Sequence, residues 1–150
     1  MTTPKVVLFI CVGNSARSLI AEAMFNANPP DGWVAASAGT NPSASANSMT
    51  GPMLREVGLD LPAHPPQLLT SEMMDQARVR VTMGCLDDAS CPARLKALEL
   101  RDWALPDPTK LDERGFRQVR DRIAASVKAL RTELILSDRR AASLARDRKQ

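Results

Sequence analysis

Three segments at the start of the chain constrain its fold more than any other feature: a short apolar run, a loop and an amphipathic helix. Residues 5–10 read KVVLFI, a run too short for a helix and of the β-branched, apolar kind found in buried strands. After a loop at 11–17, apolar side chains recur at helical spacing, namely Leu19, Ile20, Ala23, Met24 and Ala27. Strands buried on both faces occur in parallel sheets covered by helices, so this order predicts an α/β fold.

The rest of the chain continues the alternation of strands and helices. Further strands are expected at 33–36, running into 37–39, at 79–83 and at 99–103. A helix is predicted around 48–57 with Gly58 just after its end, between irregular segments at 39–47 and 59–70. One apolar stripe marks a long last helix: Phe116, Val119, Ile123, Val127, Leu130 and Leu134. This order indicates right-handed βαβ units around a small parallel sheet.

The cysteine count and the distribution of charge narrow the class of protein. Three cysteines, no signal-peptide pattern and no apolar run near the roughly 18 residues that span a bilayer indicate a cytoplasmic protein without membrane segments. Residues 139–150 carry a net charge of +4 (five basic, one acidic), whereas the other 138 residues carry −1 (15 basic, 16 acidic). We expect one domain at 1–138 and a basic helix end or tail at 139–150. A body without positive charge, and with few aromatic residues, argues against nucleic acid as a partner.

The loop at 11–17 has the composition of an oxyanion-binding site. It reads CVGNSAR and joins the carboxyl end of a strand to a helix N-terminus, which is where α/β sheets bind ligands. Backbone N–H groups in such a loop point inward, and the planar fork of an arginine grips two oxygens of a tetrahedral anion. We expect the anion to be bound by Val12, Gly13, Asn14, Ser15, Ala16 and Arg17.

The same positive surroundings favour the thiolate of Cys11, which is the nucleophilic form of a cysteine. Ser18 is placed to donate a hydrogen bond to that sulfur or to a leaving atom. The alternative is that Cys11 only fills the end of a buried strand. Gly13, which permits close backbone approach, and Asn14, which tolerates a left-handed conformation, favour the functional interpretation.

Two further thiols, Cys85 and Cys91, follow the third predicted strand. Cys85 is expected on the same rim of the sheet as Cys11. The spacing of the pair is not that of a C-x2-C zinc site and His64 is the single histidine, so no metal site is expected. The two thiols are either incidental or able to pair with each other if their loop rearranges. His64, flanked by alanine and proline, is interpreted as a packing or turn residue.

These motifs resemble the low-molecular-weight protein tyrosine phosphatase superfamily. Cys11–Ser18 resembles its phosphate loop, Ala38-Gly39-Thr40 the segment after its second strand, and Asp107-Pro108 the loop that carries its general acid. The likeness runs in order through most of residues 5–135. It implies a three-layer α/β fold, with a four-stranded parallel sheet flanked by helices, and a general-acid role for Asp107.

With its three cysteines the chain resembles the thioredoxin-coupled arsenate reductases built on that scaffold. The resemblance implies Cys11 as nucleophile and Cys85 and Cys91 as a redox pair, which reduce arsenate to arsenite through Cys11–Cys85 and then Cys85–Cys91 disulfides. Arg17, Ser18 and Asp107 complete the implied catalytic set. It implies no tightly bound cofactor, a phosphate-like oxyanion as substrate, and thioredoxin or another thiol reductant as partner.

The resemblance also leaves alternatives and departures. A low-molecular-weight phosphatase that hydrolyses phosphomonoesters is the second candidate, although Thr109 stands where tyrosine phosphatases carry an aromatic residue. A nucleic-acid or regulatory binder that uses the basic tail is the third. Some members bind potassium behind the phosphate loop through Asn, Glu, Ser and Asp; here Asn14, Glu22 and Ser37 match, and Gln67 replaces the aspartate.

Overall fold

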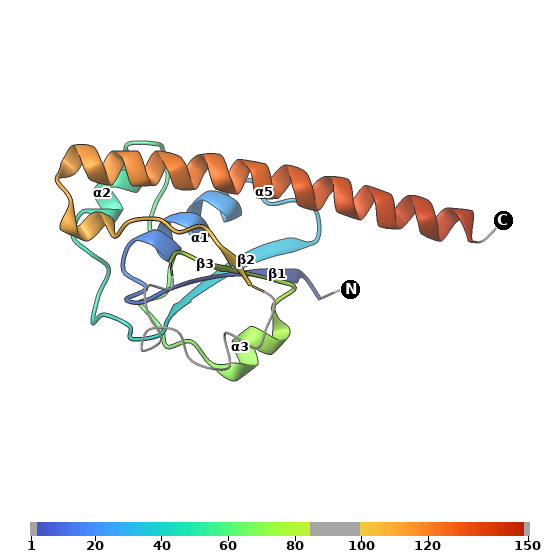
Figure 1. The fold of residues 1–150 in the computed structure, drawn as a ribbon, viewed down its shortest axis with the longest axis horizontal. Helices are drawn as coiled ribbons and strands as arrows, with labels where there is room; N and C mark the ends of the chain where they lie inside the picture. Colours follow the sequence, from blue (N-terminus) through green and yellow to red (C-terminus); the bar gives the residue numbers. More distant parts are fainter. Residues whose placement is uncertain (1–2, 85–99, 149–150) are drawn as a thin grey trace.

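Four parallel strands form the centre of the protein (Figure 1). The computed structural model describes residues 3–84 and 100–148, and its sheet has the order β2-β1-β3-β4. The strands are β1 (Lys5–Cys11), β2 (Trp33–Gly39), β3 (Val79–Thr82) and β4 (Arg101–Asp102). Each neighbouring pair is parallel, so all carboxyl ends meet at one edge. All of these strands were predicted, and β1 lies inside the sheet with Cys11 at that edge.

Helices cover both faces of the sheet (Figure 1). On one face lie α1 (Arg17–Ala27), α2 (Thr50–Arg55) and the long α5 (Glu113–Asp147). On the other lies α3 (Ser71–Gln76), and a turn of 3-10 helix, η1 (Pro108–Lys110), precedes α5. Three layers, with a four-stranded parallel sheet in the middle, confirm the predicted fold class. Within the described ranges, no helix has the length and apolar character needed to cross a membrane.

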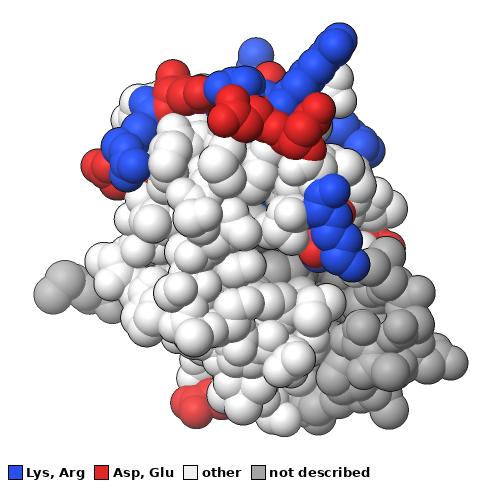
Figure 2. Space-filling view, turned by 90° about the vertical axis from the view of Figure 1, so that its left-hand side faces the viewer, with Lys and Arg blue, Asp and Glu red and all other residues white. Residues whose placement is uncertain are grey.

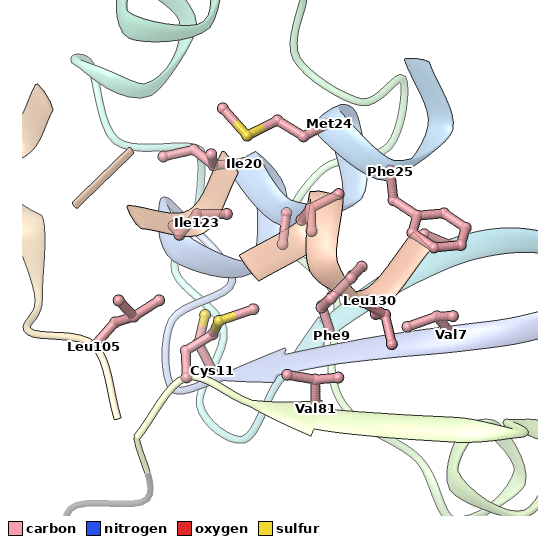
Figure 3. Packing of buried hydrophobic residues seen from close by; sticks show 14 of the residues in the cluster. Val7, Phe9, Cys11, Ile20, Met24, Phe25, Val81, Leu105, Ile123 and Leu130 are labelled. Carbon is pink, nitrogen blue, oxygen red and sulfur yellow. The ribbon is translucent and has the colours of Figure 1, made fainter. Parts of the chain in front are cut away.

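The apolar stripe predicted from the sequence holds α5 to the body. All six of its side chains, Phe116, Val119, Ile123, Val127, Leu130 and Leu134, are buried. They form one cluster with residues of α1 and β1 such as Ile20 and Phe9 (Figure 3). Burial of such a side chain contributes about 1.5–3 kcal/mol. Tertiary packing, rather than intrinsic helix propensity, therefore stabilises α5.

The short helix α3 is an element that the sequence pattern did not predict. Its six residues are too few to show a period, and only Met74 among them is buried. The available signal was its N-cap, because the Thr70 side chain accepts a hydrogen bond from the backbone N–H of Met73 at 3.1 Å and Glu72 occupies the first turn. The predicted helix around 48–57 is shorter, and Gly58 takes the expected left-handed conformation with φ +78°.

Past the apolar stripe, α5 projects beyond the sheet (Figure 1). The Asp138 carboxylate anchors it, accepting hydrogen bonds from the Trp33 indole at 2.8 Å and from Lys5 Nζ at 3.0 Å. The hydrogen bond from Trp33, which has the larger effect, and the hydrogen bond from Lys5 hold the pKa of Asp138 below its usual value. Residues 139–147 are helical and exposed. A domain boundary after residue 138 stays a prediction.

The packing of α5 predicts the effect of truncating one stripe residue. Ile123 is fully buried, so Ile123→Ala removes apolar contacts and leaves a cavity. We expect urea denaturation to show a loss of about 2–5 kcal/mol in the free energy of unfolding. The control is Leu136→Ala on the same helix, whose side chain is 58% exposed, with an expected change within about 0.5 kcal/mol. Equal losses in the two variants would contradict this account of α5.

Candidate active site

The candidate site lies where β1 ends and α1 begins, at the carboxyl edge of the sheet. Cys11 is the last residue of β1 and Arg17 the first residue of α1. The loop between them faces the positive end of the α1 dipole. Seen from this edge, charged side chains gather along the top of the molecule, around the start of α5, while uncharged residues occupy most of the centre (Figure 2). In the part that the structure describes, most of the surface seen at this edge is therefore uncharged.

The Cys11 sulfur is held by two polar contacts in a nearly closed environment. It accepts a hydrogen bond from the backbone N–H of Asn14 at 3.2 Å and lies 2.8 Å from Ser18 Oγ. The Ser18 oxygen already accepts a bond from Asn14 Nδ2 at 2.7 Å, so its hydroxyl hydrogen is available to the sulfur. Cys11 is only 8% exposed. Two donors and a helix N-terminus around one sulfur stabilise a negative charge there.

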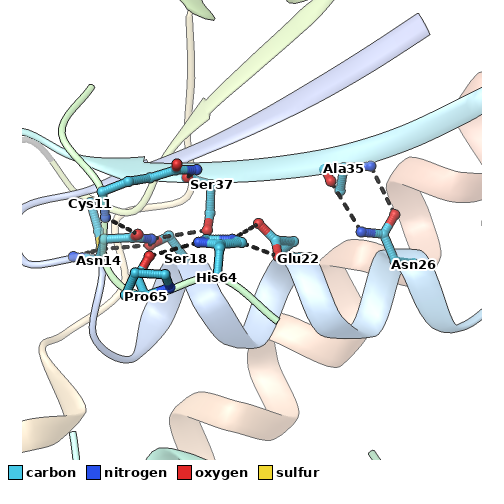
Figure 4. A network of polar contacts seen from close by, with 10 residues as sticks. Cys11, Asn14, Ser18, Glu22, Asn26, Ala35, Ser37, His64 and Pro65 are labelled. Atoms are coloured by element: carbon cyan, nitrogen blue, oxygen red, sulfur yellow. Dashed lines mark hydrogen bonds and ion pairs between the residues drawn. The ribbon is translucent and has the colours of Figure 1, made fainter. Parts of the chain in front are cut away.

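Asn14 fixes the shape of the loop from behind (Figure 4). It is fully buried and adopts φ +48°, the left-handed conformation that the sequence predicted for it. Its side chain donates to Ser18 and to Ser37 Oγ at 2.9 Å, and accepts from the backbone N–H of Gln67 at 3.0 Å. The side chain thus ties α1, β2 and the segment before α3 together. The resemblance placed Ser37 and Gln67 near Asn14 as positions of a potassium site, but the hydrogen bonds among them were not predicted.

Gly39, at the end of β2, lets the second strand approach the loop. A Cβ atom on this residue would lie only 2.4 Å from the carbonyl oxygen of Val12. Such a distance is impossible for any other residue without moving the backbone of the loop. Close packing against the phosphate loop therefore requires glycine at this position of the Ala-Gly-Thr segment.

Arg17 connects the loop to two other segments at the same edge. Its Nη1 donates to the carbonyl oxygens of Met83 at 2.8 Å and Leu105 at 2.9 Å, and the side chain is buried. Both hydrogens of Nη1 are used by these bonds, so an oxyanion would be bound by the other nitrogens of the guanidinium group. Met83 lies directly after β3 and Leu105 lies just before the Asp107 loop. Neither carbonyl carried a signal in the sequence.

Asp107 is half-buried in the loop between β4 and α5. Its Oδ1 caps η1 by accepting hydrogen bonds from Thr109, at 3.0 Å from the backbone N–H and 2.7 Å from the hydroxyl. One carboxylate oxygen is therefore engaged in the turn, and Oδ2 is the oxygen suited to proton transfer. The bond from Arg17 to Leu105 brings the start of this loop to the phosphate loop.

The two remaining candidate thiols, Cys85 and Cys91, lie outside the described residues. The chain leading to them is described as far as Gly84, which adopts φ +109°, a conformation that favours glycine. Since Met83 is bonded to Arg17, the described part of this segment ends beside the phosphate loop.

His64 is more than the packing or turn residue expected from its neighbours. Its Nε2 lies 2.8 and 3.0 Å from the two carboxylate oxygens of Glu22, and its Nδ1 lies 2.7 Å from the carbonyl of Pro65. A carbonyl cannot donate and a carboxylate only accepts, so both ring nitrogens face acceptors and the surroundings favour the protonated imidazole. Partial burial lowers the pKa of His64, but the hydrogen bonds to Glu22 and Pro65 and the carboxylate charge outweigh it and raise the pKa.

A thiol at the end of a central parallel strand, with hydrogen-bond donors and an arginine in the loop after it, is the arrangement of enzymes that attack tetrahedral oxyanions through cysteine. The family comparison agrees with this class. The chain belongs to the low molecular weight phosphotyrosine protein phosphatase family, whose model matches residues 6–141.

Among curated relatives, arsenate reductase 1 of Staphylococcus epidermidis is 32% identical over 123 residues, covering 82% of this chain and 92% of that protein. Among solved structures, a thioredoxin-dependent arsenate reductase of Corynebacterium glutamicum is 28% identical with a TM-score of 0.74, covering 91% of this chain and 65% of that one. A low-molecular-weight protein tyrosine phosphatase from T. tengcongensis is 25% identical with a TM-score of 0.70, covering 84% and 97% of the two chains. Relatives of both activities therefore share this fold.

The ion pair of His64 with Glu22 predicts a stability that depends on pH. Since the folded-state pKa of His64 is raised, the stabilisation is fully present below the unfolded value near 6.5 and is lost as pH rises through the folded pKa. We expect the difference in free energy of unfolding between the parent and His64→Gln to be largest at pH 6 and to shrink by pH 9. Urea denaturation at several pH values measures it. A difference that does not change with pH would contradict the charged pair.

Proposed function

We propose that this protein reduces arsenate to arsenite in the cytoplasm, with Cys11, Cys85 and Cys91 as a thiol relay. The observation that carries the proposal is the pair of hydrogen bonds from Arg17 to Met83 and Leu105. They join the oxyanion loop to the segment that leads to Cys85 and to the loop of Asp107. One arginine thus links the three parts of the chain that the reaction requires, and relatives named arsenate reductases support the same activity.

Oxyanion binding is the first step of the proposed mechanism. Arsenate is a tetrahedral oxyanion of the same shape and charge as phosphate, and the backbone N–H groups of residues 12–17 and the fork of Arg17 would bind it. The Cys11 thiolate, stabilised by Asn14 and Ser18, attacks arsenic. Asp107 gives its proton to the departing oxygen, which leaves as water. The product is a Cys11–arsenic(V) adduct.

Reduction follows when a second thiol attacks the sulfur of the Cys11–arsenic adduct. The Cys85 thiolate attacks the Cys11 sulfur, an S–S bond forms, and the S–As bond breaks with its electron pair going to arsenic. Arsenic is thereby reduced by two electrons and leaves as arsenite, while Cys11 and Cys85 are oxidised to a disulfide. Cys91 then attacks Cys85, which releases the Cys11 thiolate and transfers the disulfide to Cys85–Cys91.

An external thiol reductant, thioredoxin or a comparable dithiol, completes the cycle by reducing Cys85–Cys91. The uncharged surface around the loop fits a small inorganic substrate (Figure 2). Residues 41–48 beside the loop carry no charged side chain, so they offer no ion pairs to a charged peptide substrate.

Hydrolysis of phosphomonoesters is the second candidate function. It uses the same first attack and needs only Cys11, Arg17 and Asp107, with water in place of Cys85. The geometry of the Cys11 sulfur and the phosphatase neighbour favour it as a residual activity. Against it as the main role, the protein has no tyrosine, and Thr109 follows the Asp-Pro pair. The sequence therefore offers few aromatic side chains to stack against the ring of a phosphotyrosine.

Arsenate-dependent NADPH oxidation, coupled through thioredoxin and thioredoxin reductase, tests the proposal. We expect the parent to turn over repeatedly and Cys11→Ser, Cys85→Ser and Cys91→Ser each to lose multiple turnover, because each thiol takes part in every cycle. The matched control is hydrolysis of an aryl phosphate, which should survive Cys85→Ser and Cys91→Ser and disappear in Cys11→Ser. Arsenate turnover that persists without Cys85 and Cys91 would exclude the relay.

A further inference from the structure

The segment from His64 to Gln67 lies against α1, β2 and the phosphate loop, with His64 and Pro65 beside Glu22 and Asn14 in Figure 4. Most of its hydrogen bonds to these elements run from N–H donors, and the Gln67 carbonyl accepts one from the backbone N–H of Gly39. The imidazole of His64 donates to the Glu22 carboxylate of α1. The backbone N–H of Gln67 donates to Asn14 Oδ1 at 3.0 Å, and its side-chain amide donates to the Ser37 carbonyl at 2.8 Å. One short segment therefore satisfies acceptor oxygens from α1, β2 and the loop itself.

The acceptor residues, Asn14, Glu22 and Ser37, are the ones that match the potassium ligands of some relatives. A bound cation requires oxygen lone pairs that point at a common centre. Here the Glu22 carboxylate faces the His64 imidazole, and Asn14 Oδ1 and the Ser37 carbonyl accept hydrogen bonds from Gln67. The fourth position offers the neutral amide of Gln67 instead of a carboxylate. The residues present do not fit potassium.

We infer that His64 and Gln67 take the place of a bound cation and are positioning residues for oxyanion binding, so that the site needs no monovalent metal ion. The inference concerns the proposed active site, but it holds for any reaction that begins at Cys11. His64 pairs with the carboxylate of Glu22, which is buried, and a carboxylate buried without a partner is costly. Gln67 donates hydrogen bonds to Asn14 and Ser37 from the same side.

His64 and Gln67 act on oxyanion binding through Asn14. Asparagine tolerates the left-handed conformation that Asn14 adopts with φ +48°, and its surroundings fix it there. The bonds of Asn14 to Ser18, Ser37 and Gln67 are those surroundings, and its own backbone N–H faces the Cys11 sulfur. Loss of the contact between His64 and Glu22 frees the segment that ends in Gln67. The N–H groups of the loop then no longer point in one direction, and they bind an anion less tightly.

The first test compares cations. We expect the melting temperature of the parent protein, and its Kd for inorganic phosphate measured by calorimetry, to be the same in potassium chloride and in tetramethylammonium chloride of equal ionic strength. The large organic cation cannot enter a site between protein oxygens, so it controls for screening alone. A melting temperature or phosphate affinity that rises only with potassium would overturn the inference.

The second test separates positioning from a merely structural role. His64→Ala should weaken phosphate binding about tenfold, whereas His64→Gln, which keeps an N–H donor toward Glu22, should recover most of the affinity. Asp60→Ala, an exposed change on the same irregular segment, should leave the Kd unchanged. A lower melting temperature in His64→Ala with unchanged phosphate affinity would show that the pair only stabilises the fold. Phosphate binding needs neither Cys85 nor Cys91, so this result is independent of arsenate turnover.

Discussion

The buried side chain of Asn14 is the interaction on which the rest of the site depends. It contacts the nucleophilic sulfur, the start of α1, β2 and the segment before α3. Both polar atoms of its side chain are paired inside the protein, where an unpaired amide costs about 1–3 kcal/mol. The energy of these bonds holds a left-handed residue at the position where the loop must turn its N–H groups toward an anion.

Arg17 extends this preorganisation to the parts of the chain that carry the other reacting groups. Its Nη1 is bound to carbonyl oxygens after β3 and after β4. These strands end at the same edge as β1 because all pairings in the sheet are parallel. The sheet therefore brings the segments before Cys85 and Asp107 to the phosphate loop, and the arginine fixes their ends to it. The same guanidinium group that would bind the oxyanion thus also sets the geometry around it.

How far the sequence predicts this site depends on the range of each interaction. Local patterns identified the strand, loop and helix around Cys11, the left-handed Asn14 and the stripe of α5, because adjacent residues determine burial periodicity and backbone conformation. The pairing of His64 with Glu22 spans 42 positions, and the partners of Arg17 are main-chain carbonyls that any residue supplies. Such contacts follow from the register of the sheet and the path of irregular segments. Neither is encoded by a short pattern. The resemblance placed Asn14, Glu22, Ser37 and Gln67 at one site, but the pairing of His64 with Glu22 and the donor role of Gln67 emerged only from the structure.

The most direct test of the central claim, that three thiols pass two electrons to arsenate, is to locate the disulfides after one turnover. Reduced protein is mixed with arsenate without external reductant, its free thiols are alkylated, and its peptides are identified by mass spectrometry. The account predicts a Cys85–Cys91 disulfide with Cys11 alkylated in the parent, and a Cys11–Cys85 disulfide in Cys91→Ser. Alkylation of all three cysteines after arsenate, as expected after phosphate alone, would contradict it.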